Sequence, residues 1–203
     1  MSRVPWSTAA FLAVPIAAAA CSPPRSTEDR ATGAPSTTIG TASAGFEGSP
    51  EYALLARGTE TDVAGELSIR VPSGWIAKQA LAKGHAHFMS RDGRVVVTVT
   101  DTGDTPPDEA TMVRWATRPW MKLGEVELSG ARPTQLGRSG LVADEGEGSA
   151  RLSGEQARVR YARIARPTST GRAYVLVLLV TAETSMAEDR ARGHAAVQSL
   201  GPR

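Results

Sequence analysis

One segment, residues 174–180, limits the architecture more than any other part of the chain. It reads Tyr-Val-Leu-Val-Leu-Leu-Val and is apolar on both faces of an extended strand. A strand of this kind belongs in the middle of a sheet, with cover on both sides. We therefore expect an α+β fold in which a sheet is sandwiched between helices.

Other segments of strand character lie on both sides of this one in the sequence. The clearest is 94–100, which is rich in β-branched residues and follows Asp92-Gly93, a dipeptide typical of hairpin turns. Most connections are short, and short connections favour antiparallel neighbours. The sequence thus predicts a largely antiparallel sheet of five to seven strands. The further candidates are 66–71, 85–89, 125–128, 140–144 and 158–161.

Two helices are expected, and they supply the two covers of the sheet. The first begins near Thr105, which can act as N-cap before Pro106, and it must end or kink at Pro119. The second follows Ser185 and Glu188, which have the spacing of a capping box. Its small and apolar residues recur at helical spacing up to Leu200, so we expect it to close the domain.

The start of the chain has the pattern of an export signal. A single cation, Arg3, precedes an apolar run that continues to Ala20 and is too short to cross a bilayer. The sequence Ala18-Ala19-Ala20-Cys21 resembles the lipobox of bacterial lipoproteins, although that family prefers Leu where Ala18 stands. The resemblance implies removal of residues 1–20, lipidation of Cys21, and an extracytoplasmic protein anchored to the cell membrane.

The alternative is an ordinary secretory signal and a freely soluble secreted protein. Cysteine usage favours lipidation, because Cys21 is the only cysteine in the chain and a lone thiol is a liability outside the cell. A single cysteine also excludes disulfides within the chain, iron–sulfur clusters and thiolate zinc sites.

Residues 21–50 are expected to form a disordered tether after the lipidated cysteine. Of residues 22–50, 22 are Ser, Thr, Gly, Ala or Pro. Such a composition cannot bury enough apolar surface to offset the entropy lost on ordering. Residues 51–203 are then left for a single α+β domain, a length suited to one ordinary core.

The charge and the motifs of the chain mainly exclude classes of function. The chain has 23 cationic and 21 anionic side chains and no basic block, so nucleic-acid binding is not expected. The sequence contains no nucleophile elbow, metalloprotease motif, P-loop or dinucleotide fingerprint. We expect no cofactor, no catalytic residues and no enzymatic activity.

The histidines give only weak support for a metal site or a catalytic site. His85 and His87 would share one face of a strand, where Asp92 or Asp101 could complete a metal site. Two surface histidines are the favoured interpretation, so no metal site is predicted. His194 lies on the last helix, apart from any serine or carboxylate pattern.

A cluster of acidic residues, Asp144, Glu145 and Glu147, alternates with glycine. Paired carboxylates can carry out acid–base chemistry or bind calcium. We favour a solvated hairpin tip for this segment.

The candidate partner or ligand face consists of Arg158, Arg160, Arg166 and Trp120. The three arginines point the same way along one strand and could bind a carboxylate, a phosphate or a sugar acid. Trp120 follows Pro119 and is the tryptophan we expect to be exposed, and exposed aromatic residues beside arginines mark partner sites. The alternative is a solvated face of a chain rich in arginine.

Two short motifs carry a second resemblance. The segment Val71-Pro72-Ser73-Gly74-Trp75 is similar to the "VPxGW" start of the Mog1/PsbP-like superfamily, and residues 136–140 are similar to its "LxGxxG" element. The resemblance covers residues 60–201, and the layout of signal, cysteine, tether and domain resembles the LpqN-like lipoproteins.

Members of that superfamily are typically non-enzymatic and act as binding or assembly partners. The resemblance therefore implies a membrane-anchored partner of another cell-envelope protein. The alternative is a lipoprotein that binds small molecules or cell-wall fragments through its arginine-rich face, which a pocket of about 300 Å³ or more would favour.

Overall fold

The structure is a computed structural model that describes residues 50–64, 66–79, 84–169 and 171–203. The predicted signal (residues 1–20), Cys21 and nearly all of the predicted tether lie outside the described residues. The one exception is Pro50, which opens a short helix. The described helices are α2 (Pro50–Leu55), α3 (Glu109–Ala116), the 3₁₀ turn η1 (Pro119–Met121) and α4 (Ala187–Gln198).

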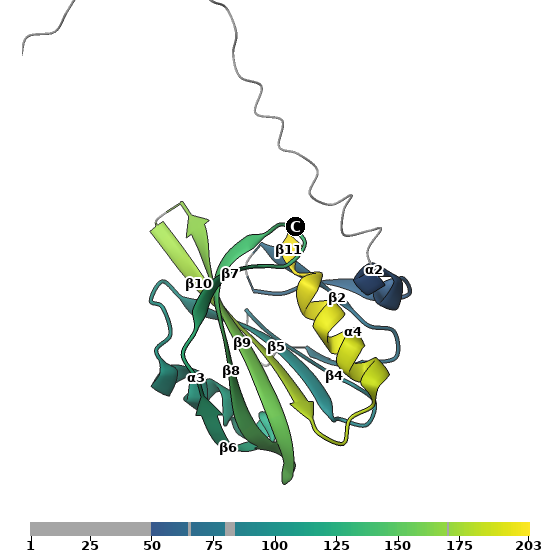
Figure 1. Cartoon of the computed structure of the whole chain (residues 1–203). Coiled ribbons are helices and arrows are strands. Elements are labelled where there is room, and N and C mark those ends of the chain that lie inside the picture. Colours follow the sequence, from purple (N-terminus) through teal and green to yellow (C-terminus); the bar gives the residue numbers. More distant parts are fainter. Residues whose placement is uncertain (1–49, 65, 80–83, 170) are drawn as a thin grey trace, which may run out of the picture. The chain divides into compact units, whose positions relative to one another are not determined.

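The described part of the chain forms two antiparallel sheets (Figure 1). The larger has the order β3-β4-β5-β10-β9-β8-β6, and β7 also pairs with β8. The smaller has the order β1-β2-β11. The strands are β1 (Thr59–Asp62), β2 (Leu67–Val71), β3 (Ile76–Gln79), β4 (His85–Met89), β5 (Val95–Gly103), β6 (Leu123–Leu128), β7 (Arg132–Leu136), β8 (Leu141–Leu152), β9 (Glu155–Thr168), β10 (Gly171–Ala182) and β11 (Gly201–Pro202).

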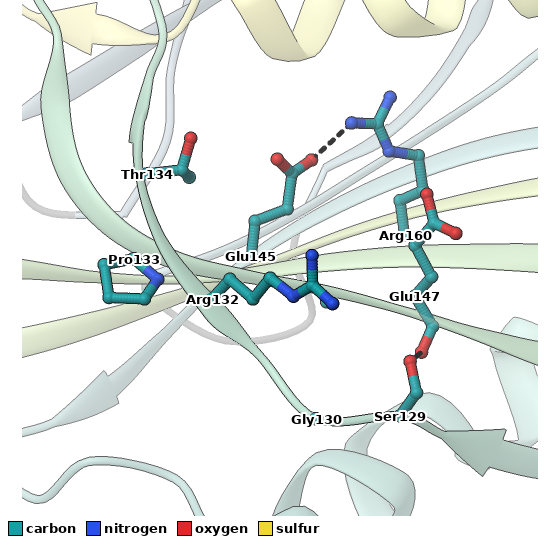
Figure 2. A pocket seen from close by; sticks show the side chains of 9 residues that line it. Ser129, Gly130, Arg132, Pro133, Thr134, Glu145, Glu147 and Arg160 are labelled. Atoms are coloured by element: carbon teal, nitrogen blue, oxygen red, sulfur yellow. Dashed lines mark hydrogen bonds and ion pairs between the residues drawn. The ribbon is translucent and has the colours of Figure 1, made fainter.

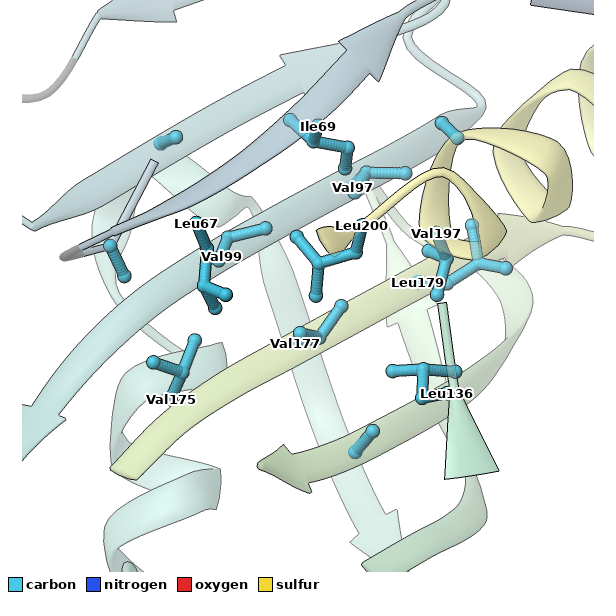
Figure 3. Close-up of a cluster of buried hydrophobic side chains, with 14 of the residues drawn as sticks. Leu67, Ile69, Val97, Val99, Leu136, Val175, Val177, Leu179, Val197 and Leu200 are labelled. Carbon is cyan, nitrogen blue, oxygen red and sulfur yellow. The ribbon is translucent and has the colours of Figure 1, made fainter. Parts of the chain in front are cut away.

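The predicted central strand is confirmed as β10, which lies between β5 and β9. Because side chains alternate along a strand, β10 contributes to a separate core on each face. The first core, on the α4 side, includes Ile164. Figure 3 shows ten of its other members, Leu67, Ile69, Val97, Val99, Leu136, Val175, Val177, Leu179, Val197 and Leu200. The second core, on the α3 side, includes Val96, Met112, Ala116, Met121, Leu123, Val159, Tyr161, Leu176, Leu178 and Val180.

The two helices cover opposite faces of the large sheet, as the sequence predicted. In Figure 1, α4 lies across the sheet on one side, and its residues Ala196 and Val197 join the first core. Helix α3 contributes Met112 and Ala116 to the second core. No helix in the described ranges has the length and apolar character needed to span a bilayer.

The predicted strand count of five to seven is wrong, because eleven strands are present in the described residues. The missed strands are β1, β3, β7 and β11, and each lacks the alternation that reveals a strand. For example, β1 reads Thr-Glu-Thr-Asp and β7 contains Pro133, which cannot donate a ladder hydrogen bond. These strands form because a neighbouring strand offers free hydrogen-bonding groups. For β1, β3 and β7 that neighbour is the next strand in the sequence, and for β11 it is β2, far back in the chain.

Both predicted helix starts are displaced toward the C-terminus. Asp108, not Thr105, is the N-cap of α3, and its carboxylate accepts a hydrogen bond from the Thr111 backbone N–H at 2.7 Å. Helix α4 starts after Met186, and the Ser185 hydroxyl donates to the Ala182 carbonyl instead of capping the helix. The expected end of the first helix is confirmed, since α3 stops before Pro119, which opens η1.

Candidate functional site

An open hollow on the described surface lies over β8 and β9, on the face that carries the first core. Its volume is about 480 Å³ and it is open to solvent. We call it the basin (Figure 2). It is lined by Ser129, Gly130, Arg132, Pro133, Thr134, Glu145, Gly146, Glu147 and Arg160.

A break in strand pairing creates the basin. Strand β6 pairs with the C-terminal half of β8 and β7 pairs with its N-terminal half. Between them, residues 129–131 cross beside β8 without continuing either ladder. The Ser129 backbone N–H and hydroxyl both donate to the Glu147 carbonyl, at 2.7 Å and 2.6 Å, and hold this crossing segment in place.

Tyr161 supports the crossing segment from beneath. Its hydroxyl donates to the Ser129 carbonyl. The ring is 3 % exposed and packs in the space beside Gly146, where a Cβ would lie 2.5 Å from ring atom Cζ. Burial raises the pKa of the Tyr161 phenol, so the hydroxyl remains a donor at neutral pH. The glycine at 146 is therefore required by the ring that holds the rim.

A row of alternating charges crosses the basin from β7 to α4. Arg132 lies directly opposite Glu145 in the β7–β8 ladder, so their side chains share a face. The Glu145 carboxylate accepts a hydrogen bond from Arg160 Nη2 at 2.6 Å. Arg160 Nη1 in turn donates to His194 Nδ1 at 3.2 Å. The row links three strands to the helix.

The ion pair in this row uses only half of the basin's charges. It joins Arg160 to Glu145, and their side chains are 39 % and 25 % exposed. Arg132 and Glu147 also line the hollow, both are exposed, and neither takes part in an ion pair of the described chain. Figure 2 shows both side chains reaching into the hollow from neighbouring strands. The basin therefore has one available cation and one available anion.

The interpretation of the acidic cluster as a hairpin tip is wrong. Asp144, Glu145 and Glu147 lie within the twelve-residue strand β8. Alternation places Asp144 on the α3 side, where it pairs with Arg163 at 3.4 Å, and it places the two glutamates in the basin. The glycines between them gave a turn-like composition, but Gly146 accommodates the Tyr161 ring.

The three arginines predicted to form one face do not converge on one site. Arg160 lies in the basin. Arg158 lines a separate open hollow of about 450 Å³ together with Arg190 of α4. Arg166 pairs with Asp101 of β5 at 3.4 Å. Alternation still gives the three the same side of β9, as the sequence indicated.

Trp120 lies apart from these arginines, on the opposite face of the sheet. It is half-buried against the second core, and the Arg118 guanidinium lies 5.1 Å from its ring centroid. Arg118 also stacks 3.2 Å above the ring centroid of Trp115. The expected meeting of Trp120 with the arginines of β9 is therefore absent from the described structure.

His85 completes this aromatic group on the α3 side. Its ring centroid is 6.0 Å from that of Trp115 and 5.9 Å from that of Trp120. Its Nδ1 and the Thr100 hydroxyl are 2.7 Å apart. Burial, and secondarily the charge of Arg118, lower the pKa of His85 below its usual value, so the ring is neutral at pH 7.

The histidines of β4 are not arranged as a metal site. His87 is buried, and its Nδ1 lies 3.1 Å from the Thr98 hydroxyl. Asp101 is engaged by Arg166, and Asp92 accepts hydrogen bonds from its own turn. Within the described ranges, no group of three or more His, Cys, Asp or Glu side chains is placed to hold a metal ion.

Sequence reasoning missed Arg132, Thr134 and Glu147 as members of the site. Arg132 and Thr134 belong to β7, which Pro133 concealed. One signal could have identified them: the Gly-containing segment 137–140 leads into the strand predicted at 140–144, and such a turn commonly joins two paired strands. That pattern is typical of a hairpin and would have brought Arg132 beside Glu145.

Comparisons with known proteins return matches among solved structures alone. No family model and no curated protein matches the chain. The chain is similar to a protein of Bacteroides thetaiotaomicron (TM-score 0.45, 11 % identity, 72 % of this chain and 48 % of that one). It therefore spans about half of the length of the Bacteroides protein.

Two other solved structures are of the types that the sequence resemblance named. One is LpqN of Mycobacterium tuberculosis, described as involved in cell envelope biogenesis (TM-score 0.43, 16 % identity, 75 % of this chain and 85 % of that one). The other is the Ran-binding protein Mog1p of Saccharomyces cerevisiae (TM-score 0.41, 16 % identity, 71 % and 96 %). These values describe a likeness of fold and carry no conclusion about function, so membership of the Mog1/PsbP-like superfamily stays a prediction.

Proposed function

We propose that this chain is a non-catalytic cell-envelope lipoprotein that acts as a binding or assembly partner of another envelope protein. The proposal takes its location from the sequence, in which an export signal (residues 1–20) precedes a single cysteine, Cys21. It takes its binding surface from the basin. The Mog1/PsbP-like resemblance of residues 60–201 implies the same kind of role.

The observation that carries the binding role is the availability of both charges in an open hollow. Arg132 and Glu147 line the same concave surface, and the one ion pair of the basin leaves both available. A partner of complementary charge can pair with both side chains, and complementary charge gives an interface its specificity. The rim is fixed by Ser129 and Tyr161, so the surface is ordered before binding.

The anchor is tested by membrane fractionation of Cys21→Ala. We expect this variant to fold and to leave the membrane fraction, because no thiol remains to be lipidated. Ser22→Ala is the matched control and should stay with the membrane. A Cys21→Ala protein that still sediments with membranes would contradict the lipid anchor.

The partner role is tested by cross-linked pull-down of the native protein from membranes. The signal and tether fused to an unrelated domain serve as the control for non-specific capture. We expect one envelope protein to be enriched by the native chain and lost with Arg132→Glu, while Arg158→Glu, outside the basin, retains it. Equal enrichment by all the forms would refute a partner role for the basin.

A second candidate function, binding of a small molecule or a cell-wall fragment, is favoured by the volume of the basin. At about 480 Å³ it lies within the range of roughly 300–1,000 Å³ typical of small-ligand sites. It also contains Arg160, one of the arginines predicted for such a ligand. A binding titration that uses defined ligands, described below, tests this candidate directly.

A further inference from the structure

The basin has an equal number of positive and negative side chains, and this limits the ligands that it can accept. Its cations are Arg132 and Arg160, and its anions are Glu145 and Glu147. A ligand that is only anionic would approach two carboxylates, and one that is only cationic would approach two guanidinium groups. For either kind of ligand, the attraction to one pair of side chains is offset by repulsion from the other pair at close range.

The internal ion pair determines which charges remain for a ligand. Arg160 is directly opposite Glu147 in the β8–β9 ladder, yet its guanidinium is turned toward Glu145 and His194. Arg160 is therefore held by two partners along the row toward α4. Glu147 and Arg132 are left available in the hollow, and they come from different strands.

The remaining lining residues favour a polar ligand of narrow cross-section. Ser129, Gly130, Thr134 and Gly146 are small, and Pro133 is the one apolar side chain larger than a methyl group among the nine lining residues. No aromatic or long aliphatic side chain lines the hollow, so it offers little surface to an acyl chain or an aromatic ring. The Thr134 hydroxyl and the backbone of residues 129–130 can form hydrogen bonds with amide groups.

We propose that the basin binds short peptides that carry both a free carboxylate and a free ammonium group. The carboxylate is bound by Arg132, whose planar guanidinium suits two parallel hydrogen bonds. The ammonium is bound by Glu147. This inference rests on the proposed function in one respect, the assignment of the basin as the binding surface, and it adds the chemical class of the ligand.

The test is a calorimetric titration of the full-length protein in detergent at pH 7, with tri-alanine as the probe. Two blocked peptides are compared with it: N-acetyl-tri-alanine, which lacks the ammonium, and tri-alanine amide, which lacks the carboxylate. We expect tri-alanine to bind and each blocked peptide to bind about tenfold more weakly, since each loses one charge-assisted contact. Inorganic phosphate, a pure anion, should not compete.

Two variants assign each end of the peptide to its residue. Glu147→Gln should bind tri-alanine and its acetylated form with equal affinity, because the carboxylate that binds the ammonium is gone. In Arg132→Gln, tri-alanine and its amide should bind equally. Both side chains are exposed, so neither change should alter folding, which circular dichroism checks. Arg158→Gln, which lies outside the basin, is the matched control and should bind all three peptides as the native chain does.

Two results would overturn the ligand class: no binding of tri-alanine, or blocked peptides that bind as tightly as the free one. If phosphate alone binds, the basin is an anion site. These outcomes are separate from the partner test. If the pull-down depends on Arg132 but no peptide binds, the peptide proposal is refuted and the partner role stands. If peptides bind but no protein is captured, the partner role is refuted and the peptide proposal stands.

Discussion

Substitution of Gly146 by alanine should damage the basin through the ring of Tyr161. In the native structure a Cβ at position 146 would lie 2.5 Å from Cζ and from the hydroxyl oxygen of that ring. Ordinary contact begins near 3.4 Å, so the ring must move by about 1 Å. It is 3 % exposed and packs in the second core, so it has little room to do so.

The cost has two parts. Overpacking a filled core costs about 1–3 kcal/mol. If the ring moves away, the hydrogen bond from the Tyr161 hydroxyl to the Ser129 carbonyl is lost as well, at about 0.5–1.5 kcal/mol. We therefore expect Gly146→Ala to lower the free energy of unfolding by about 1.5–4.5 kcal/mol.

The assay is urea unfolding of Gly146→Ala beside Gly124→Ala. The control glycine lies in β6, where a Cβ would meet nothing within 4 Å, so its substitution should be nearly neutral. In a Tyr161→Leu background the clashing ring atoms are gone, and Gly146→Ala should cost much less than in the native chain. A native-like Gly146→Ala protein, or costs that simply add in the double variant, would refute this account of the rim.

Two further predictions concern stability. Ile164→Ala should lower the free energy of unfolding by about 2–5 kcal/mol, because Ile164 is fully buried in the first core. Val142→Ala, at a residue that is 69 % exposed, should be nearly neutral. Equal urea midpoints for the two variants would contradict this prediction. Burial and Arg118 lower the pKa of His85 from 6.5, so the unfolded chain takes up this proton more readily. The contribution of His85 to stability is then complete above pH 6.5 and is lost as pH falls through its folded pKa. Unfolding followed by fluorescence between pH 8 and pH 5 should show a shallower fall for His85→Gln, and identical slopes would argue against a neutral buried ring.

The centre of the fold could be predicted because its residues carry the signal themselves. Val175–Val180 of β10 are apolar at consecutive positions, and only a strand covered on both faces accommodates that pattern. The edges of the fold could not be predicted in this way. Strand β1 is polar throughout, so nothing in its own residues marks it as a neighbour of β2. Strand β11 is two residues long, and its pairing with β2 depends on where the rest of the chain has placed that strand.

The same distinction applies to the site: features local to one strand could be predicted, and contacts between strands could not. Arg160 was found because it alternates with buried residues within a single strand. Its pairing with Glu145, and the presence of Arg132 and Glu147 beside it, depend on the register of three strands. Trp120 was predicted to be exposed because it follows a proline, but η1 turns it against the second core. Local pattern identifies the face of a side chain, and register decides its neighbours.

The place of β10 in the sheet has a consequence for how the chain folds as it is made. Its ladder with β5 joins residues roughly eighty positions apart, and both cores need it. Until β10 has been synthesised, β5 and β9 each lack their central partner and present unpaired backbone groups at an open edge. During synthesis the chain therefore exists for a time as an incomplete sheet. In that state it is exposed to aggregation and proteolysis, and binding by a chaperone would protect it.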